Sequence, residues 1–251
     1  MRKLVAGNWK MNGLRADAIA RADALVRRVA ERQPQCDLLL CPPATLLVQI
    51  SAVLGASGIA LGGQDCHPEP KGAHTGDIAA PMLKDCGCSH IILGHSERRA
   101  DHHETDALVR AKLEAARAAG LVPIVCVGET AAQRDGRETL AVIGRQLQGS
   151  LPEGLGIAPL VIAYEPVWAI GSGGTPTAAE VADVHGFIRV ELGTRVADPS
   201  TVPILYGGSV NARNAGNILT IANVDGALVG GASLDAEAFW TIATCAGGEH
   251  R

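Results

Sequence analysis

Aromatic residues are scarce in this 251-residue chain, at 3% of the composition with three Trp, two Tyr and two Phe. Aliphatic side chains must therefore fill the core, and an apolar share of 47% is enough for a large one. The formal net charge of −4 provides no general attraction to nucleic acid, so we expect no nucleic-acid partner. No apolar run is long enough to span a bilayer, and Leu4–Ala6 is too short for a signal peptide. We therefore expect no membrane association.

The chain also lacks the short motifs of several large enzyme classes. The first apolar run is not followed by a G-x-G-x-x-G dinucleotide loop, and there is neither a G-x-x-x-x-G-K-[ST] phosphate loop nor an H-E-x-x-H zinc helix. Cysteines number seven, and the lone C-x-C pair at Cys86 and Cys88 is a poor zinc motif. We expect reduced thiols in a cytoplasmic protein, with no metal and no cofactor.

Short apolar runs typical of β-strands alternate along the chain with amphipathic stretches typical of helices. Helices are expected over residues 16–32, 101–119, 130–148 and 177–192, with Glu104 at a solvated helix start. No Ser/Gly linker divides the chain, so we predict one domain over residues 1–251, a parallel (β/α)8 barrel of the α/β class. An open doubly wound sheet is the competing fold. The eight expected strands are Leu4–Gly7, Leu38–Cys41, Ile59–Gly62, His90–Leu93, Val122–Val127, Leu160–Ala163, Ile204–Tyr206 and Ala227–Val229.

The chemistry of such a barrel lies at the carboxyl ends of its strands. Glu165 follows the sixth strand, and Pro166 stops that strand at once. An apolar segment and a glycine-rich segment come next, which suggests a lid that closes over a base. The lid residues are Pro166, Val167, Trp168, Ala169, Ile170, Gly171, Ser172, Gly173, Gly174, Thr175 and Pro176.

Polar side chains follow two other strands. Asn8 and Lys10 come after the first strand, and their spacing places an amide and an ammonium on the same side of an extended segment. His95 follows the fourth strand at the start of a helical turn, where the helix dipole disfavours the charged imidazole. These residues suggest electrophilic groups that face the base.

Paired glycines follow the last two strands, at Gly207-Gly208 and Gly230-Gly231. Without Cβ atoms, their backbone N–H groups can converge on an anion, and barrels commonly bind phosphate at this position. A base, a neutral imidazole, an ammonium, an amide and a phosphate cradle suit proton transfer beside a carbonyl in a small phosphorylated substrate.

Six short motifs occur in order along the chain. They are GNWKMN at 7–12, GAHTGD at 72–77, ILGHSERR at 92–99, YEPVWAIG at 164–171, YGGSV at 206–210 and LVGGAS at 228–233. By these motifs the chain resembles the triosephosphate isomerase family over essentially its whole length. The resemblance implies a TIM barrel and a cofactor-free aldose-ketose isomerase of glycolysis and gluconeogenesis. Such an enzyme interconverts dihydroxyacetone phosphate and D-glyceraldehyde 3-phosphate through an enediol(ate).

The resemblance also implies roles for individual residues. Glu165 would be the base and His95 the neutral electrophile. Lys10 would stabilise developing charge, Asn8 would orient a substrate oxygen, and Glu97 would position Lys10. The backbone N–H groups that would hold the phosphate belong to Gly171, Ser209, Gly230 and Gly231.

A homodimer is implied by the resemblance as well. In this family a loop like Gln64–Asp77 reaches into a second subunit, with Thr75 near the neighbour's active site. The chain departs from the family pattern at Gly174, where lysine or arginine is common. It also departs at Asp65, often asparagine, and at Asp77, often glutamate. None of these departures touches the acid–base residues.

Three alternatives stay open at this point. An isomerase of a longer ketose phosphate, such as a tetrulose phosphate, would use the same chemistry, and substrate competition would reveal it. A non-catalytic phosphosugar-binding barrel would bind phosphate without turnover. An additional extracellular adhesion role has no support in the sequence, and surface labelling of intact cells would test it.

Overall fold

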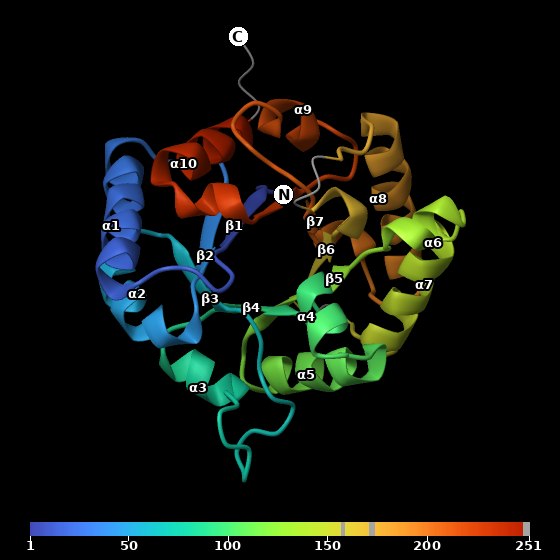
Figure 1. Cartoon of the computed structure of the whole chain (residues 1–251), viewed down its shortest axis with the longest axis horizontal. Helices are drawn as coiled ribbons and strands as arrows, with labels where there is room; N and C mark the ends of the chain where they lie inside the picture. Colours follow the sequence, from blue (N-terminus) through green and yellow to red (C-terminus); the bar gives the residue numbers. More distant parts are fainter. Residues whose placement is uncertain (157–158, 171–173, 248–251) are drawn as a thin grey trace.

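A computed structural model describes residues 1–156, 159–170 and 174–247. In this part of the chain, eight parallel strands close into a barrel in sequence order (Figure 1). β1 pairs with both β2 and β8, so no strand edge is left open. The strands are β1 (Leu4–Asn8), β2 (Asp37–Cys41), β3 (Ala60–Gly63), β4 (His90–Leu93), β5 (Val122–Val127), β6 (Val161–Tyr164), β7 (Ile204–Tyr206) and β8 (Gly226–Val229).

Helices surround the barrel as an outer ring (Figure 1). The α-helices are α1 (Arg15–Glu31), α2 (Leu47–Leu54), α3 (Ala80–Asp85), α4 (Ser96–Asp101), α5 (Asp106–Ala118), α6 (Ala131–Asp135), α7 (Thr139–Ser150), α8 (Ala178–Leu192), α9 (Ala215–Leu219) and α10 (Ala236–Cys245). Short 3-10 turns are η1 (Ala44–Leu46), η2 (Val167–Ala169), η3 (Pro199–Thr201) and η4 (Gly231–Leu234).

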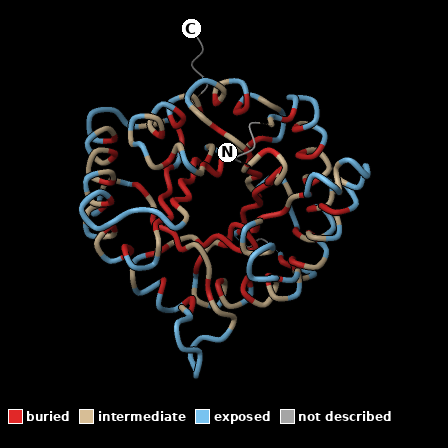
Figure 2. The backbone as a smooth tube through the Cα atoms, viewed as in Figure 1, coloured by how far each residue is buried: buried red, intermediate tan, exposed pale blue. Residues whose placement is uncertain are grey.

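The core has two layers because successive side chains of a strand point to opposite faces. In β1, Val5 packs toward the helices, whereas Leu4 and Ala6 belong to the barrel interior. Figure 2 shows the strands as a buried ring inside the exposed outer faces of the helices. Aliphatic and thiol side chains fill the interior, which explains why few aromatic residues are needed. The interior cluster is Leu4, Ala6, Leu39, Cys41, Ile92, Ile124, Cys126, Val161, Ala163, Leu205 and Leu228.

The predicted barrel is confirmed, and every predicted strand agrees with the observed one to within one residue at each end. Two helix predictions were wrong in extent. Residues 101–119 were expected to be one helix, but α4 ends at Asp101 and α5 begins at Asp106. Residues 130–148 form α6 and α7 instead of one helix. The breaks contain His103 and Arg137, whose φ angles of 55° and 60° are left-handed and cannot continue a right-handed helix.

None of the helices in the described ranges combines the length and apolar character needed to cross a membrane.

Candidate active site

The carboxyl ends of several strands surround a cavity of about 360 Å³. This volume suits a small molecule. Thr75, by contrast, lies exposed on the loop between β3 and α3, which projects beyond the helices at the bottom of Figure 1. The cavity brings together seven of the nine predicted catalytic and phosphate-binding residues, with Ile170 of the predicted lid. Its lining includes Asn8, Lys10, His95, Glu165, Ile170, Ser209, Gly230 and Gly231.

The position of Glu165 is set by the close approach of β5 and β6. Its backbone N–H donates to the Val127 carbonyl at 2.8 Å. A Cβ atom at Gly128 would lie 1.8 Å from the Glu165 carbonyl oxygen, so only glycine fits there. The side chain is buried, with Oε1 2.8 Å from His95 Nε2 and Oε2 accepting from the Ser96 N–H at 2.9 Å.

These contacts keep the Glu165 carboxylate ionised. Burial raises the pKa of Glu165, but the His95 ring and the Ser96 N–H lower it by more, so the net shift is downward. A buried carboxylate that is charged at neutral pH can accept a proton from a substrate.

His95 occupies the N-cap of α4, as the sequence predicted for the start of a helical turn. Its Nδ1 accepts the Glu97 N–H at 3.2 Å, which requires Nδ1 to be unprotonated. The ring proton therefore lies on Nε2, which faces Glu165. Burial lowers the pKa of His95, and the Glu165 carboxylate raises it by more while the two groups touch. The expected preference for neutral imidazole thus depends on the position of Glu165.

Lys10 has a left-handed backbone, with φ of 52°, which is uncommon for a residue with a side chain. Two contacts hold it. Asn8 Oδ1 accepts the Lys10 N–H at 3.0 Å, and Gln64 Nε2 donates to the Lys10 carbonyl at 2.9 Å. Lys10 Nζ lies 2.5 Å from Glu97 Oε1, which is the pairing that the resemblance implied. Gln64 was missed as a supporting residue, although it directly follows β3.

The glycine pairs form an open rim at the ends of β7 and β8. Within the described residues, no hydrogen-bond acceptor takes the backbone N–H of Ser209, Gly230 or Gly231. The turn η4 begins at Gly231. Free N–H groups around one cavity can bind a phosphate. Gly171, Ser172 and Gly173 lie outside the described residues.

The apolar half of the predicted lid forms the turn η2 and packs against polar groups at the ends of β5 and β6. Trp168 Nε1 donates to Glu129 Oε1 at 2.8 Å, and the Tyr164 hydroxyl donates to the same oxygen at 3.2 Å. The Ser209 hydroxyl donates to the Ala169 carbonyl at 2.8 Å. Glu129 was missed at the sequence level, although it lies two residues after β5, where strand-end chemistry is expected.

Arg134 also contacts the predicted lid. The Arg134 guanidinium of α6 lies 3.6 Å from the centroid of the Trp168 ring. Arg134 also pairs with Glu180. Glu180 and Thr177 form the capping box that begins α8, directly after the lid. The lid tip and its C-terminal end are thereby linked through one arginine.

An ion cluster joins the buried side chains of Lys112 and Glu104 to the partly exposed side chains of Asp65 and Arg98. Lys112 Nζ lies 2.5 Å from Glu104 Oε1 and 2.8 Å from Asp65 Oδ1. Arg98 contacts both carboxylates, at 2.6 Å and 2.9 Å. The expectation that Glu104 lies at a solvated helix start was wrong, because its side chain is 2% exposed and these cations hold it inside.

Cys126 belongs to the barrel interior, consistent with a packing role. Burial raises the pKa of its thiol well above the ordinary range, so it is a poor nucleophile. All seven cysteines are free thiols.

The chain is similar to known proteins in both sequence and structure. The family model described as Triosephosphate isomerase matches residues 3–246. The triosephosphate isomerases of Bradyrhizobium diazoefficiens and Afipia carboxidovorans are 56% and 54% identical over 244 residues, which is 97% of this chain and 97% of each relative. The crystal structure of triosephosphate isomerase from Bartonella henselae superposes with a TM-score of 0.90 at 46% identity and covers 98% of this chain and 99% of that one.

Proposed function

The chain belongs to the triosephosphate isomerase family, and from this membership we propose that its cavity interconverts dihydroxyacetone phosphate and D-glyceraldehyde 3-phosphate. The observation that carries the proposal is the pair of Glu165 and His95. A buried, ionised carboxylate lies 2.8 Å from an imidazole Nε2 inside a cavity of about 360 Å³. Proton transfer next to a carbonyl needs a base and an electrophile in the same cavity.

In the proposed reaction, Glu165 removes a proton from the carbon next to the substrate carbonyl and returns it to the neighbouring carbon. The electrons of the broken C–H bond move to the carbonyl oxygen, which produces the enediolate. The carboxylate must leave the His95 ring to reach that carbon. Once it does, the contact that most raises the pKa of His95 is lost. Burial and the Lys10 charge then favour the neutral ring, and the Glu97 carboxylate still favours the charged one.

The neutral ring then serves as the proposed electrophile. Its Nε2–H donates to the oxygen that gains charge, and the Lys10 ammonium stabilises the same charge. The Asn8 amide is proposed to orient a substrate oxygen. Glu97 is proposed as a positioning residue, because its carboxylate contacts Lys10 Nζ and its backbone N–H sets the His95 tautomer.

The phosphate of the substrate is proposed to bind the free N–H groups of Ser209, Gly230 and Gly231, together with Gly171 of the lid. Closure of the lid would exclude water, which matters because an enediolate can expel its phosphate group. The contacts of Trp168 and Ala169 with Glu129 and Ser209 support a lid that packs in a defined position.

A single domain over residues 1–251, a cytoplasmic location and a homodimer complete the proposal. The free thiols suit a reducing compartment. A second cavity of about 580 Å³ lies beside Lys10 and Gln64, where the partner's loop would enter. Sedimentation velocity is expected to show a dimer, and Thr75→Arg is expected to weaken it. A fully active monomer at nanomolar concentration would contradict the dimer.

The isomerase assay compares wild type with Glu165→Asp, which shortens the base by one methylene. We expect turnover of D-glyceraldehyde 3-phosphate to fall about a hundredfold or more, because a displacement of this order misplaces the base. Glu153→Asp makes the same change on a side chain that is 89% exposed and should leave turnover unchanged. An undamaged Glu165→Asp enzyme would show that the base is assigned wrongly.

A further inference from the structure

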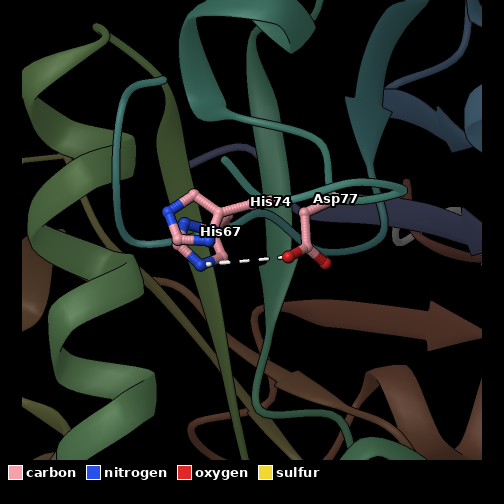
Figure 3. Close-up of side chains that lie close together, drawn as sticks. All are labelled: His67, His74 and Asp77. Carbon is pink, nitrogen blue, oxygen red and sulfur yellow. Dashed lines mark ion pairs between the residues drawn. The ribbon is translucent and has the colours of Figure 1, made fainter. Parts of the chain in front are cut away.

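Two imidazoles and a carboxylate meet on the loop between β3 and α3. Figure 3 shows the rings of His67 and His74 together, with the Asp77 carboxylate directed at His67. The ring centroids lie 3.8 Å apart, and His67 Nε2 is 3.9 Å from Asp77 Oδ2. One potential ligand atom from each residue lies within 4.8 Å of the others. None of these three side chains lines the proposed catalytic cavity.

The loop backbone holds this cluster together. The His67 N–H donates to the Ile78 carbonyl at 2.8 Å, and His67 and Ala79 form an isolated parallel β-bridge. These backbone contacts close the base of the loop. The Asp77 N–H donates to the His74 carbonyl at 3.0 Å, which makes a tight turn between the other two members. A Cβ atom at Gly72 would lie 3.0 Å from the His74 ring, so glycine leaves space for it.

Two imidazole nitrogens and one carboxylate oxygen form a donor set that Zn²⁺ accepts, with water as the fourth ligand. We propose that His67, His74 and Asp77 form a binding site for Zn²⁺ or a similar divalent transition metal on the loop. Tetrahedral bonds of about 2.0–2.2 Å place neighbouring donors about 3.3 Å apart. The three donor atoms lie within 4.8 Å of one another, so metal binding has to draw them together by up to about 1.5 Å and turn the two stacked rings toward a common point.

Metal binding at His67 would break one hydrogen bond of the loop. The Glu69 N–H donates to His67 Nδ1 at 3.0 Å, so the neutral ring carries its proton on Nε2. Binding of metal at Nε2 moves the ring proton to Nδ1 and releases the Glu69 N–H, which is exposed to water. This exchange weakens the site, and we expect micromolar affinity.

The metal would brace the segment that carries Thr75. His74 and Asp77 flank Thr75, so coordination fixes the chain on both sides of it. His67 and Asp77 also line the second cavity, so in the proposed homodimer the metal site lies beside the partner's loop.

The test uses the full chain, freed of metal with EDTA and titrated with ZnCl2 by equilibrium dialysis. We expect about one Zn²⁺ per chain. His74→Phe keeps an aromatic ring against His67 but has no ligand atom, and Asp77→Asn removes the charge from the carboxylate. Each is expected to weaken binding at least tenfold. His103→Asn is the matched control, since it removes an exposed histidine elsewhere and asparagine tolerates the left-handed backbone there.

X-ray absorption of the zinc-loaded protein gives a second readout that does not depend on activity. We expect only nitrogen and oxygen neighbours at about 2.0 Å. Sulfur neighbours at about 2.3 Å would show binding to cysteine and would overturn the proposal. Unchanged affinity in both His74→Phe and Asp77→Asn, or no binding at millimolar ZnCl2, would overturn it equally.

Discussion

Removal of the Lys112 charge is expected to destabilise the fold strongly. Lys112 contacts Glu104 and Asp65, and Arg98 contacts the same two carboxylates, so two positive and two negative charges balance. Lys112→Met leaves a net negative charge in a buried place. Breaking a buried ion pair by loss of one partner costs about 3–5 kcal/mol. We expect the lower end, about 3 kcal/mol, because Arg98 keeps one contact with each carboxylate.

Neutralising Asp65 should compensate in part for the loss of the Lys112 charge. Burial raises the pKa of Asp65 despite Lys112 and Arg98, whereas for Glu104 these cations outweigh burial and the pKa is lowered. Asp65 is therefore the less well compensated charge. Addition of Asp65→Asn to Lys112→Met restores neutrality and should recover about 1–2 kcal/mol of unfolding free energy.

Thermal and denaturant unfolding at a fixed protein concentration measure the effect. A loss of about 3 kcal/mol corresponds to a fall in Tm of about 6–12 °C for a chain of this size. Lys84→Met makes the same change at an exposed lysine and should cost less than about 0.5 kcal/mol.

The difference in unfolding free energy between wild type and Lys112→Met should depend on pH. Without Lys112 the folded variant binds protons on Glu104 and Asp65 more readily than wild type does, so the stability gap should narrow as pH falls from 8 to 5. A double variant less stable than Lys112→Met, or a single variant within 1 kcal/mol of wild type, would refute the charge-balance argument.

Other expectations concern the site and the thiols. Gly128→Ala should lower kcat at least tenfold, because its Cβ would lie 1.8 Å from the carbonyl oxygen of Glu165, the proposed base. Gly186→Ala, with no atom within 4 Å of its Cβ, should be harmless, and equal effects of the two would contradict this steric account. His95→Gln should lower kcat about a hundredfold or more with circular dichroism unchanged, since the amide cannot relay protons; near-normal kcat would remove His95 from the mechanism. Thiol reagents at pH 8 should label the partly exposed Cys86 and Cys245 rapidly and the five buried cysteines only after unfolding, which peptide mapping would check.

The strand pattern could be read from the sequence because it is local. Runs of Val, Ile, Leu and Ala bounded by Gly and Pro predict strands without knowledge of their partners, and eight of them alternating with helices have few ways to pack. The strand-end rule then placed Asn8, Lys10, His95 and Glu165 around one cavity, as observed.

What the sequence could not decide depends on groups brought together by the fold. Glu104 lies in a polar segment that the sequence suggests is solvated, but its ion pairs with Lys112 and Arg98 hold it in the interior. The helix is interrupted just before it, at His103, whose backbone is left-handed. Glu129 has no motif of its own and gains its role from Trp168, 39 residues further along.

Sequence alone determined the barrel, its strand positions and the family, because apolar periodicity and short motifs are properties of neighbouring residues. Tertiary structure alone decided which charges are buried together, which tautomer His95 takes, what holds the lid, and that His67, His74 and Asp77 converge. These are properties of distance and dielectric environment, and residues far apart in the chain acquire them only when the barrel closes.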